Sequence, residues 1–279
     1  MSPLWPRLGL FFFFWAVTLQ VAPALLVNLG GQLLAGTGTT FLAGWLANTV
    51  CLRVFERRSL AAAGLGGGRA SVRNLALGLG GGAGVAFLVL AMPVAAGMAR
   101  FAYDPEGVSS FEGLLFIYAL LAFGAAGEEM LFRGYAFQLL LGRLGVAATV
   151  VPAGVLFALL HGDNPYSTWL ALTNTAGFGI LFGVAFLRSR DLWLPIGLHL
   201  GWNLALPFLG ANLSGFTMRV TGLRVVWDAP EAALWSGGAY GPEGGLFASM
   251  GLVFLALFLW KAPLARQVAP LWDPPAESA

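Results

Sequence analysis

Long apolar segments separated by short polar stretches run along the whole chain, and this pattern predicts membrane-spanning helices. An α-helix needs about 20 mostly apolar residues to cross a bilayer. Eight segments approach or exceed that length, at residues 8–29, 33–52, 75–99, 112–138, 145–161, 167–187, 191–210 and 244–260. The pattern therefore predicts an all-α fold, a polytopic membrane bundle of about eight transmembrane helices.

The first apolar segment has a second interpretation as a signal peptide, because Ala22-Pro23-Ala24 resembles a cleavage site between small residues. However, Arg7 is the only basic residue that precedes the apolar run, and the run continues beyond Ala24. A retained helix is the favoured interpretation, and we expect residues 1–279 to form a single membrane domain.

Basic residues in the connecting loops predict the orientation, because Lys and Arg concentrate in cytoplasmic loops. In an eight-span arrangement, 11 of the 15 basic residues fall on one side, among them Arg53, Arg57 and Arg58. We expect this side, with both termini, to face the cytoplasm. Residues 56–73 would form a cytoplasmic connection, and residues 211–243 an external loop.

Composition excludes a soluble protein and narrows the set of partners. Hydrophobic residues make up 58% of the chain and charged residues 10%, with a mean hydropathy of +0.79, whereas soluble proteins carry about 25% charged residues. The basic residues are scattered singly, which is not typical of a nucleic-acid-binding surface. The single cysteine, Cys51, excludes an intrachain disulfide and a multi-cysteine metal site. Membrane lipid is the expected surrounding.

Ionisable and amide side chains inside the predicted spans gather in three motifs, and such residues in a membrane are usually functional. The motifs supply Glu128, Glu129 and Arg133 from the fourth segment, Phe157 and His161 from the fifth, and His199 and Asn203 from the seventh. The chain has two histidines, and both lie in these motifs.

Helix geometry brings the motif residues into relation with one another. Glu129 and Arg133 are four positions apart, so they share a helix face and can pair. Glu128 is turned by about 100° from Glu129, so it is the carboxylate that Arg133 is less able to neutralise. At about 1.5 Å per residue, Glu128, His161 and His199 lie roughly 12 to 20 Å from the cytoplasmic ends of their helices. We therefore expect three helices to converge on one intramembrane cavity.

This set of groups suits the activation of a water molecule for hydrolysis. A carboxylate can act as the base, an imidazole can orient the water, and imidazole or amide donors can stabilise an oxyanion. The three motifs contain no hydroxyl or thiol nucleophile, and the chain has no His-Glu-x-x-His helix. Three alternatives remain: a zinc ion held by two imidazoles and a carboxylate, a buried ion-pair cluster, and a proton- or ion-coupled transporter.

The ordered motifs Glu-Glu-x-x-x-Arg, Phe-x-x-x-His and His-x-x-x-Asn resemble those of the CPBP family of intramembrane endopeptidases. This family includes the type II CAAX prenyl endopeptidase and bacterial proteins described as abortive-infection proteins. The run Leu192-Trp193-Leu194-Pro195-Ile196 before His199 is also similar to the family. The resemblance covers about residues 110–210, which we expect to form the catalytic core.

The resemblance implies glutamate-dependent hydrolysis of a peptide bond, with no cofactor. By position in the motifs, Glu128 would activate the water with help from His161, while Glu129 and Arg133 would set the geometry. Phe157 would pack the site, and His199 with Asn203 would stabilise the oxyanion. Zinc stays possible but is not favoured.

The substrate is expected to be a membrane-associated peptide or a lipidated protein. The high glycine and alanine content with a single lysine is typical of a GC-rich bacterial genome, so we expect a multi-pass protein of a bacterial inner membrane. A non-catalytic immunity or binding protein that keeps the fold is a further alternative, which the intact motifs disfavour.

Overall fold

A computed structural model describes residues 3–107, 110–228 and 233–272. The long helices of this part of the chain are α1 (Leu4–Cys51), α2 (Arg69–Ala95), α3 (Phe111–Arg133), α4 (Tyr135–Leu144), α5 (Val146–Leu159), α6 (Trp169–Ser189), α7 (Trp193–Phe208) and α9 (Leu246–Lys261). A π-helical turn at Leu52–Glu56 and 3-10 turns at Leu60–Ala63, Gly238–Tyr240 and Pro242–Gly244 lie between them, with a short α8 at Ala233–Ser236. The helical bundle agrees with the expected fold class.

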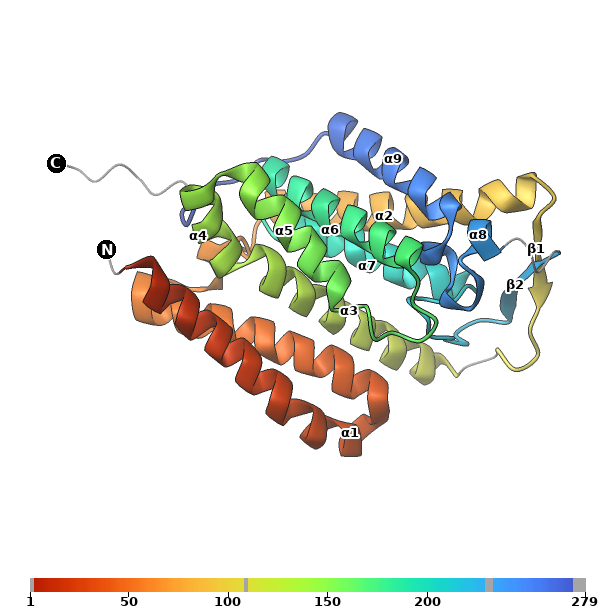
Figure 1. Cartoon of the computed structure of the whole chain (residues 1–279), viewed down its shortest axis with the longest axis horizontal. Coiled ribbons are helices and arrows are strands. Elements are labelled where there is room, and N and C mark those ends of the chain that lie inside the picture. The colour runs from red at the N-terminus through yellow and green to blue at the C-terminus, as the bar shows by residue number, and fades with distance from the viewer. Residues whose placement is uncertain (1–2, 108–109, 229–232, 273–279) are drawn as a thin grey trace.

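Four helical segments are long and apolar enough to cross a membrane, namely Leu4–Glu56, Arg69–Ala95, Phe111–Leu144 and Trp169–Ser189. Val146–Leu159 and Leu246–Lys261 are shorter apolar helices. A multi-pass membrane protein is therefore supported, while the number of eight spans stays a prediction. The start of α1 and the segment after α9 lie at the same end of the molecule (Figure 1), and the side of the membrane that this end faces also stays a prediction.

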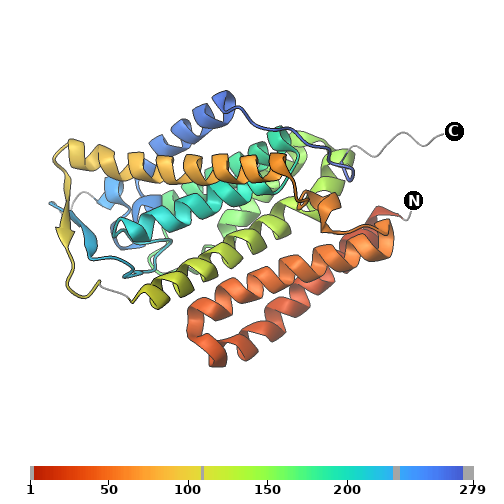
Figure 2. The ribbon, with the colours of Figure 1, turned by 180° about the vertical axis from the view of Figure 1, so that it is seen from behind.

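The helix α1 is a hairpin of two arms rather than one rod (Figures 1 and 2). The break falls at Gly30 and Gly31, where Gly31 adopts a φ of 74°, a left-handed conformation that favours glycine. The break coincides with the gap between the first two predicted apolar segments. Glycine therefore explains how the 48-residue segment Leu4–Cys51 can fold back along itself.

Close helix packing through glycine positions the core of the bundle. The helices α2 and α7 approach so closely that a Cβ at Gly82 would collide with the carbonyl of Leu198, and one at Gly201 with that of Leu79. A second close approach joins α1 to α3, because a Cβ at Gly127 would lie 2.5 Å from the backbone nitrogen of Phe41. Small residues are the usual contact points between membrane helices. Gly127 directly precedes Glu128, so this contact also fixes the glutamates.

The structure corrects the fourth predicted segment, 112–138, which is not one continuous helix. The helix α3 ends at Arg133, and α4 begins at Tyr135 after a non-helical Gly134. Asn48 of α1 stabilises the break: its amide nitrogen donates to the carbonyl of Met130, at 2.9 Å, and its amide oxygen accepts from the backbone nitrogen of Tyr135, at 2.7 Å. The apolar pattern continues through Gly134, so hydropathy alone does not reveal this break.

The third predicted segment, 75–99, also ends earlier than expected. The helix α2 stops at Ala95, and Ala99–Tyr103 forms strand β1, which pairs antiparallel with β2 (Leu223–Trp227). Ala99 lies opposite Trp227, and Tyr103 opposite Leu223. This small sheet lies at the end of the molecule remote from the start of α1 (Figure 1). Part of the expected external loop is thus a strand that is tied to the end of α2.

Candidate active site

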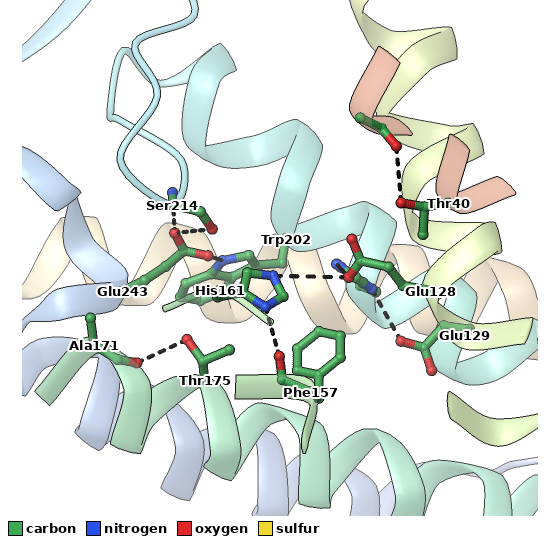
Figure 3. Close-up of polar contacts among 12 residues, drawn as sticks. Thr40, Glu128, Glu129, Phe157, His161, Ala171, Thr175, Trp202, Ser214 and Glu243 are labelled. Carbon is green, nitrogen blue, oxygen red and sulfur yellow. Dashed lines mark hydrogen bonds and ion pairs between the residues drawn. The ribbon is translucent and has the colours of Figure 1, made fainter. Parts of the chain in front are cut away.

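Side chains from α3, from the turn that follows α5 and from α7 meet inside the bundle (Figure 3). Arg133 and Glu129, both from α3, are completely buried there. Arg133 Nη1 donates to Glu129 Oε1 at 3.1 Å, and Nη2 donates to the carbonyl of Gly179 at 2.5 Å. A buried guanidinium needs such partners, because an unpaired charge in a low-dielectric interior is strongly destabilising. The pairing expected from the four-residue spacing is present.

Aromatic rings enclose the Arg133 guanidinium. Its carbon lies 5.1 Å from the ring centre of Phe157, 5.6 Å from Phe132 and 5.7 Å from Phe182. Cation–π contacts of this kind are worth about 2 kcal/mol or more when they are removed from water. Phe157 also contacts both histidine rings, with centre-to-centre distances of 4.8 Å to His161 and 5.8 Å to His199. Phe157 therefore packs the site, in line with the motif.

Glu129 connects Arg133 to His199. The oxygen that accepts from Arg133 also lies 3.1 Å from His199 Nδ1. An ionised carboxylate can only accept, so His199 Nδ1 carries a hydrogen and donates it. The His199 ring stacks on Phe182 at 5.2 Å between centres. These contacts fix the ring and leave its Nε2 facing Glu128.

Glu128 lies between the two imidazoles. Its Oε2 atom is 3.8 Å from His199 Nε2 and 4.0 Å from His161 Nε2. A direct hydrogen bond between nitrogen and oxygen spans about 2.7 to 3.2 Å, so neither contact is one. This oxygen is buried and has no hydrogen-bond partner in the part of the chain that the structure describes. The separations are short enough for one water molecule to bridge the groups.

His161 lies just beyond the last residue of α5, as the Gly-Asp-Asn-Pro run after it predicts. Its Nδ1 is 2.8 Å from the carbonyl oxygen of Phe157. A carbonyl accepts only, so Nδ1 is the donor, and the Nε2 of a neutral ring is an acceptor aimed at Glu128. Figure 3 shows His161 between Glu128 on one side and Glu243 on the other.

Asn203 differs from the other predicted residues. It follows His199 by one turn of α7, and its side chain forms no hydrogen bond with any described residue. The structure thus brings together Glu128, Glu129, Arg133, Phe157, His161 and His199, and it places Asn203 next to them without a bond to them.

The structure adds a buried carboxylate that the motifs do not contain. Glu243 accepts hydrogen bonds from Trp202 Nε1, at 3.0 Å, and from both the backbone nitrogen and the hydroxyl of Ser214. Burial raises the pKa of Glu243, while these bonds and the nearby His161 lower it. One sequence signal could have revealed it, because Glu243 directly precedes the last apolar segment.

Metal ligation was the open alternative for this cluster. Across residues 3–107, 110–228 and 233–272, no group of three or more His, Cys, Asp or Glu side chains is arranged to hold a metal ion. Within that part of the chain, the carboxylate of Glu128 is instead flanked by the imidazoles of His161 and His199.

The geometry defines a helical membrane protein with a polar cluster of carboxylates and imidazoles inside its bundle. Residues 110–205 match the family described as type II CAAX prenyl endopeptidase Rce1-like. The resemblance expected from the motifs is confirmed, and the match supports a protease of the CAAX-protease type. The matched segment runs from the residue that caps α3 into α7 and contains every residue of the predicted site. No curated protein matches the chain.

Proposed function

We propose that the protein is an intramembrane endopeptidase that hydrolyses a peptide bond of a membrane-associated peptide or protein. One observation supports this above the others: the unpaired Glu128 Oε2 lies 3.8 and 4.0 Å from the Nε2 atoms of two histidines. A structural ion-pair cluster would pair each carboxylate directly with a cation, as Arg133 pairs with Glu129 Oε1. Glu128 is instead spaced for a bridging water and is partly exposed, at 26%.

In this mechanism Glu128 is the general base. A water between Glu128 and His161 donates one hydrogen to Glu128 Oε2 and the other to His161 Nε2, so its lone pair points away from both groups. As the oxygen attacks the peptide carbonyl carbon, its proton moves to Glu128. The carbon–nitrogen bond then breaks, and protonated Glu128 returns that proton to the leaving amine. General acid–base catalysis of this kind typically contributes about 10²- to 10⁴-fold in rate.

His199 would stabilise the oxyanion. Its Nδ1 hydrogen is engaged by Glu129, so its Nε2 can donate to an oxyanion only when the ring is protonated. A protonated ring balances the charges, because Glu128 and Glu129 carry two negative charges and Arg133 one positive charge. Asn203, on the same face of α7, would supply a second donor through its unbonded amide. Preorganised donors to an oxyanion are each worth about 10²- to 10³-fold in rate.

Arg133 and Phe157 would act by holding the other groups in place. Arg133 fixes Glu129, and Phe157 packs against both imidazoles while its carbonyl sets the tautomer of His161. No step of this mechanism requires a metal ion, so we propose a glutamic rather than a zinc-dependent peptidase. We further propose a substrate that is lipidated or otherwise anchored to the bilayer, and residence in a bacterial inner membrane.

The deciding experiment compares the wild type with Glu128→Gln in liposomes, using two quenched fluorescent peptides. One is farnesylated at the cysteine of a CAAX sequence, and the other has the same sequence on a fatty-acyl anchor. We expect the wild type to cleave at least one peptide, with the product bond identified by mass spectrometry, and Glu128→Gln to lose at least 10³-fold in kcat. Glu112→Gln is the matched control, because Glu112 lies at the exposed start of the same helix. The proposal fails if the wild type cleaves neither peptide or if Glu128→Gln cleaves normally.

A further inference from the structure

Glu243 is held more completely than any side chain in the motifs. Both of its oxygens accept: Oε1 from Trp202 Nε1, and Oε2 from the Ser214 backbone nitrogen and from the Ser214 hydroxyl at 2.9 Å. The residue is 9% exposed. Hydrogen bonds to a charged group contribute more to stability than those between neutral groups. A buried carboxylate with this many donors is held in one position and connects the groups that donate to it.

The main chain at Glu243 is fixed as well. Asn174 of α6 donates through its amide nitrogen to the carbonyls of Glu243, at 2.9 Å, and Gly245, at 3.0 Å. The hydroxyl of Ser249 in α9 donates in turn to the amide oxygen of Asn174 at 2.7 Å. The backbone of Glu243 is therefore anchored to α6 and α9, and its side chain reaches away from them to other elements.

Of those other elements, α7 carries His199, and the turn that contains Ser214 contacts the loop that follows His161. Trp202 lies on α7, three residues after His199 and next to Asn203, and its indole packs on Phe178 at 4.6 Å between ring centres. Ser214 lies in the turn that continues from α7. At Gly215, with a φ of 90°, this turn approaches Pro165 so closely that a Cβ would collide with the Pro165 carbonyl. Pro165 belongs to the loop that begins at His161.

We propose that Glu243 is a positioning residue of the active site: its carboxylate joins Trp202 to Ser214 and thereby fixes the relative placement of His161 and His199 on the two sides of Glu128. This inference rests on the proposed function. It assigns a role to a residue outside the segment, 110–205, that matches the protease family.

A connection between the His161 turn and α7 is needed because the two histidines lie on different elements. The ring is carried by the turn after α5, and α5 packs mainly on α6 and α4, whereas His199 is carried by α7. The Nε2 atoms of both rings must stay about 4 Å from one carboxylate oxygen. A displacement of about 1 Å at a reacting centre can cost 10²-fold in rate. A link between the turn and α7 resists that displacement.

The test uses Glu243→Gln, Trp202→Phe and the double variant with whichever anchored peptide the wild type cleaves. Trp202→Phe keeps an aromatic ring and removes the N–H donor. Each variant is assayed at a temperature where its thermal unfolding curve shows it to be fully folded. We expect Glu243→Gln to lower kcat by about 10- to 100-fold with KM within twofold, because misplaced groups affect the transition state rather than substrate binding.

The coupling between Glu243 and Trp202 distinguishes a shared positioning role from two independent losses of packing. The double variant should be no slower than Glu243→Gln alone, since both changes remove the same bond. Glu106→Gln is the control: it removes a carboxylate that pairs with exposed Arg219 in the external region, and it should leave kcat unchanged. The inference fails if Glu243→Gln has a normal kcat, or if the losses of the two single variants multiply in the double variant. Either outcome would leave the proposed peptidase function standing, provided that Glu128→Gln is inactive.

A second measurement does not depend on catalysis. Spin labels placed at Asp163→Cys and Phe208→Cys, in a Cys51→Ala background, report the distance between the His161 turn and the end of α7 by pulsed electron resonance. Both positions are exposed. We expect a single narrow distance distribution in the otherwise native protein and a broadened or shifted one with Glu243→Gln. An unchanged distance distribution would contradict the positioning role of Glu243, even if no peptide is cleaved.

Discussion

Glu129 Oε1 lies 3.1 Å from Arg133 Nη1 and also 3.1 Å from Nδ1 of His199, which is 70 residues away from Glu129 in the chain, so one buried oxygen joins a guanidinium to an imidazole. This relationship divides the paired glutamates into two kinds. Glu129 is fully buried, and its Oε1 contacts both Arg133 and His199. Glu128 Oε2 instead lies 3.8 and 4.0 Å from two imidazole nitrogens, without a direct hydrogen bond to either. The predictions below follow from that division.

Glu129→Gln is expected to lower kcat by about 10²-fold while leaving KM within threefold. The amide oxygen could still accept from both Arg133 and His199, as Oε1 does in the wild type. The change would remove the negative charge that favours a protonated His199 for the oxyanion. Steady-state cleavage of the anchored peptide in liposomes measures both constants. A variant with normal kcat would show that His199 does not depend on Glu129.

Arg133→Met should destabilise the folded protein by about 3 to 5 kcal/mol, because it removes the permanently charged partner of the buried Glu129 carboxylate. The free energy of unfolding can be measured by titration with a denaturing detergent. Arg100→Met is the matched control, since Arg100 pairs with Asp228 in an exposed ion pair, and exposed pairs are worth about 0 to 1 kcal/mol. Equal losses for the two variants would contradict the enclosed role of Arg133.

Peptide cleavage should be insensitive to metal chelators, because Glu128 activates the water without a Lewis acid in the proposed mechanism. The measurement is the cleavage rate after prolonged incubation with 1,10-phenanthroline, with its non-chelating 1,7 isomer as the control. Loss of activity with the 1,10 isomer only, restored by added zinc, would replace the glutamic mechanism with a metal-dependent one.

The buried Glu243 predicts a pH dependence of stability. Burial raises its pKa above the ordinary value of 4.5, with partial opposition from Trp202, Ser214 and His161, while the neighbouring Tyr240 stays neutral because burial raises its pKa to about 12. A carboxyl group whose folded pKa is raised stabilises the fold below its unfolded pKa, and this contribution is lost as the pH rises through the folded pKa. Between pH 4.5 and 8 the wild type should therefore lose thermal stability relative to Glu243→Gln. Parallel melting-temperature curves would contradict this.

Contacts within one helix could be predicted from the sequence, whereas contacts between elements could not. Glu129 and Arg133 are four residues apart within α3, so helix periodicity alone places them together. The bond from Glu129 to His199 depends on how α7 packs against α3, which apolar patterns do not specify. The same reasoning explains the break at Gly134: the hydropathy is continuous there, and the cause is the side chain of Asn48, which is distant in sequence.

The contacts of Glu243 also could not be predicted from the sequence. Its partners lie on α7 and in an irregular turn, where no repeating pattern relates one position to the next. The prediction of a loop at residues 211–243 was wrong in part, because Leu223–Trp227 is a strand that pairs with Ala99–Tyr103. Irregular segments owe their shape to specific hydrogen bonds such as those of Asn174, and these appear only when distant parts of the chain are placed together.

The interruption at Gly134 uncouples two stretches of chain that would otherwise rotate as one rod. A residue inserted into an unbroken helix turns every side chain on one side of it by about 100° relative to the other side. Asn48 holds the break immediately after Arg133. A residue inserted into Tyr135–Leu144 would therefore not rotate α3, and Glu128 and Glu129 would keep their orientation about the helix axis. Variation at the loop end of this element is thus tolerated, while the stretch that begins at Gly127 is not free to slip by even one residue.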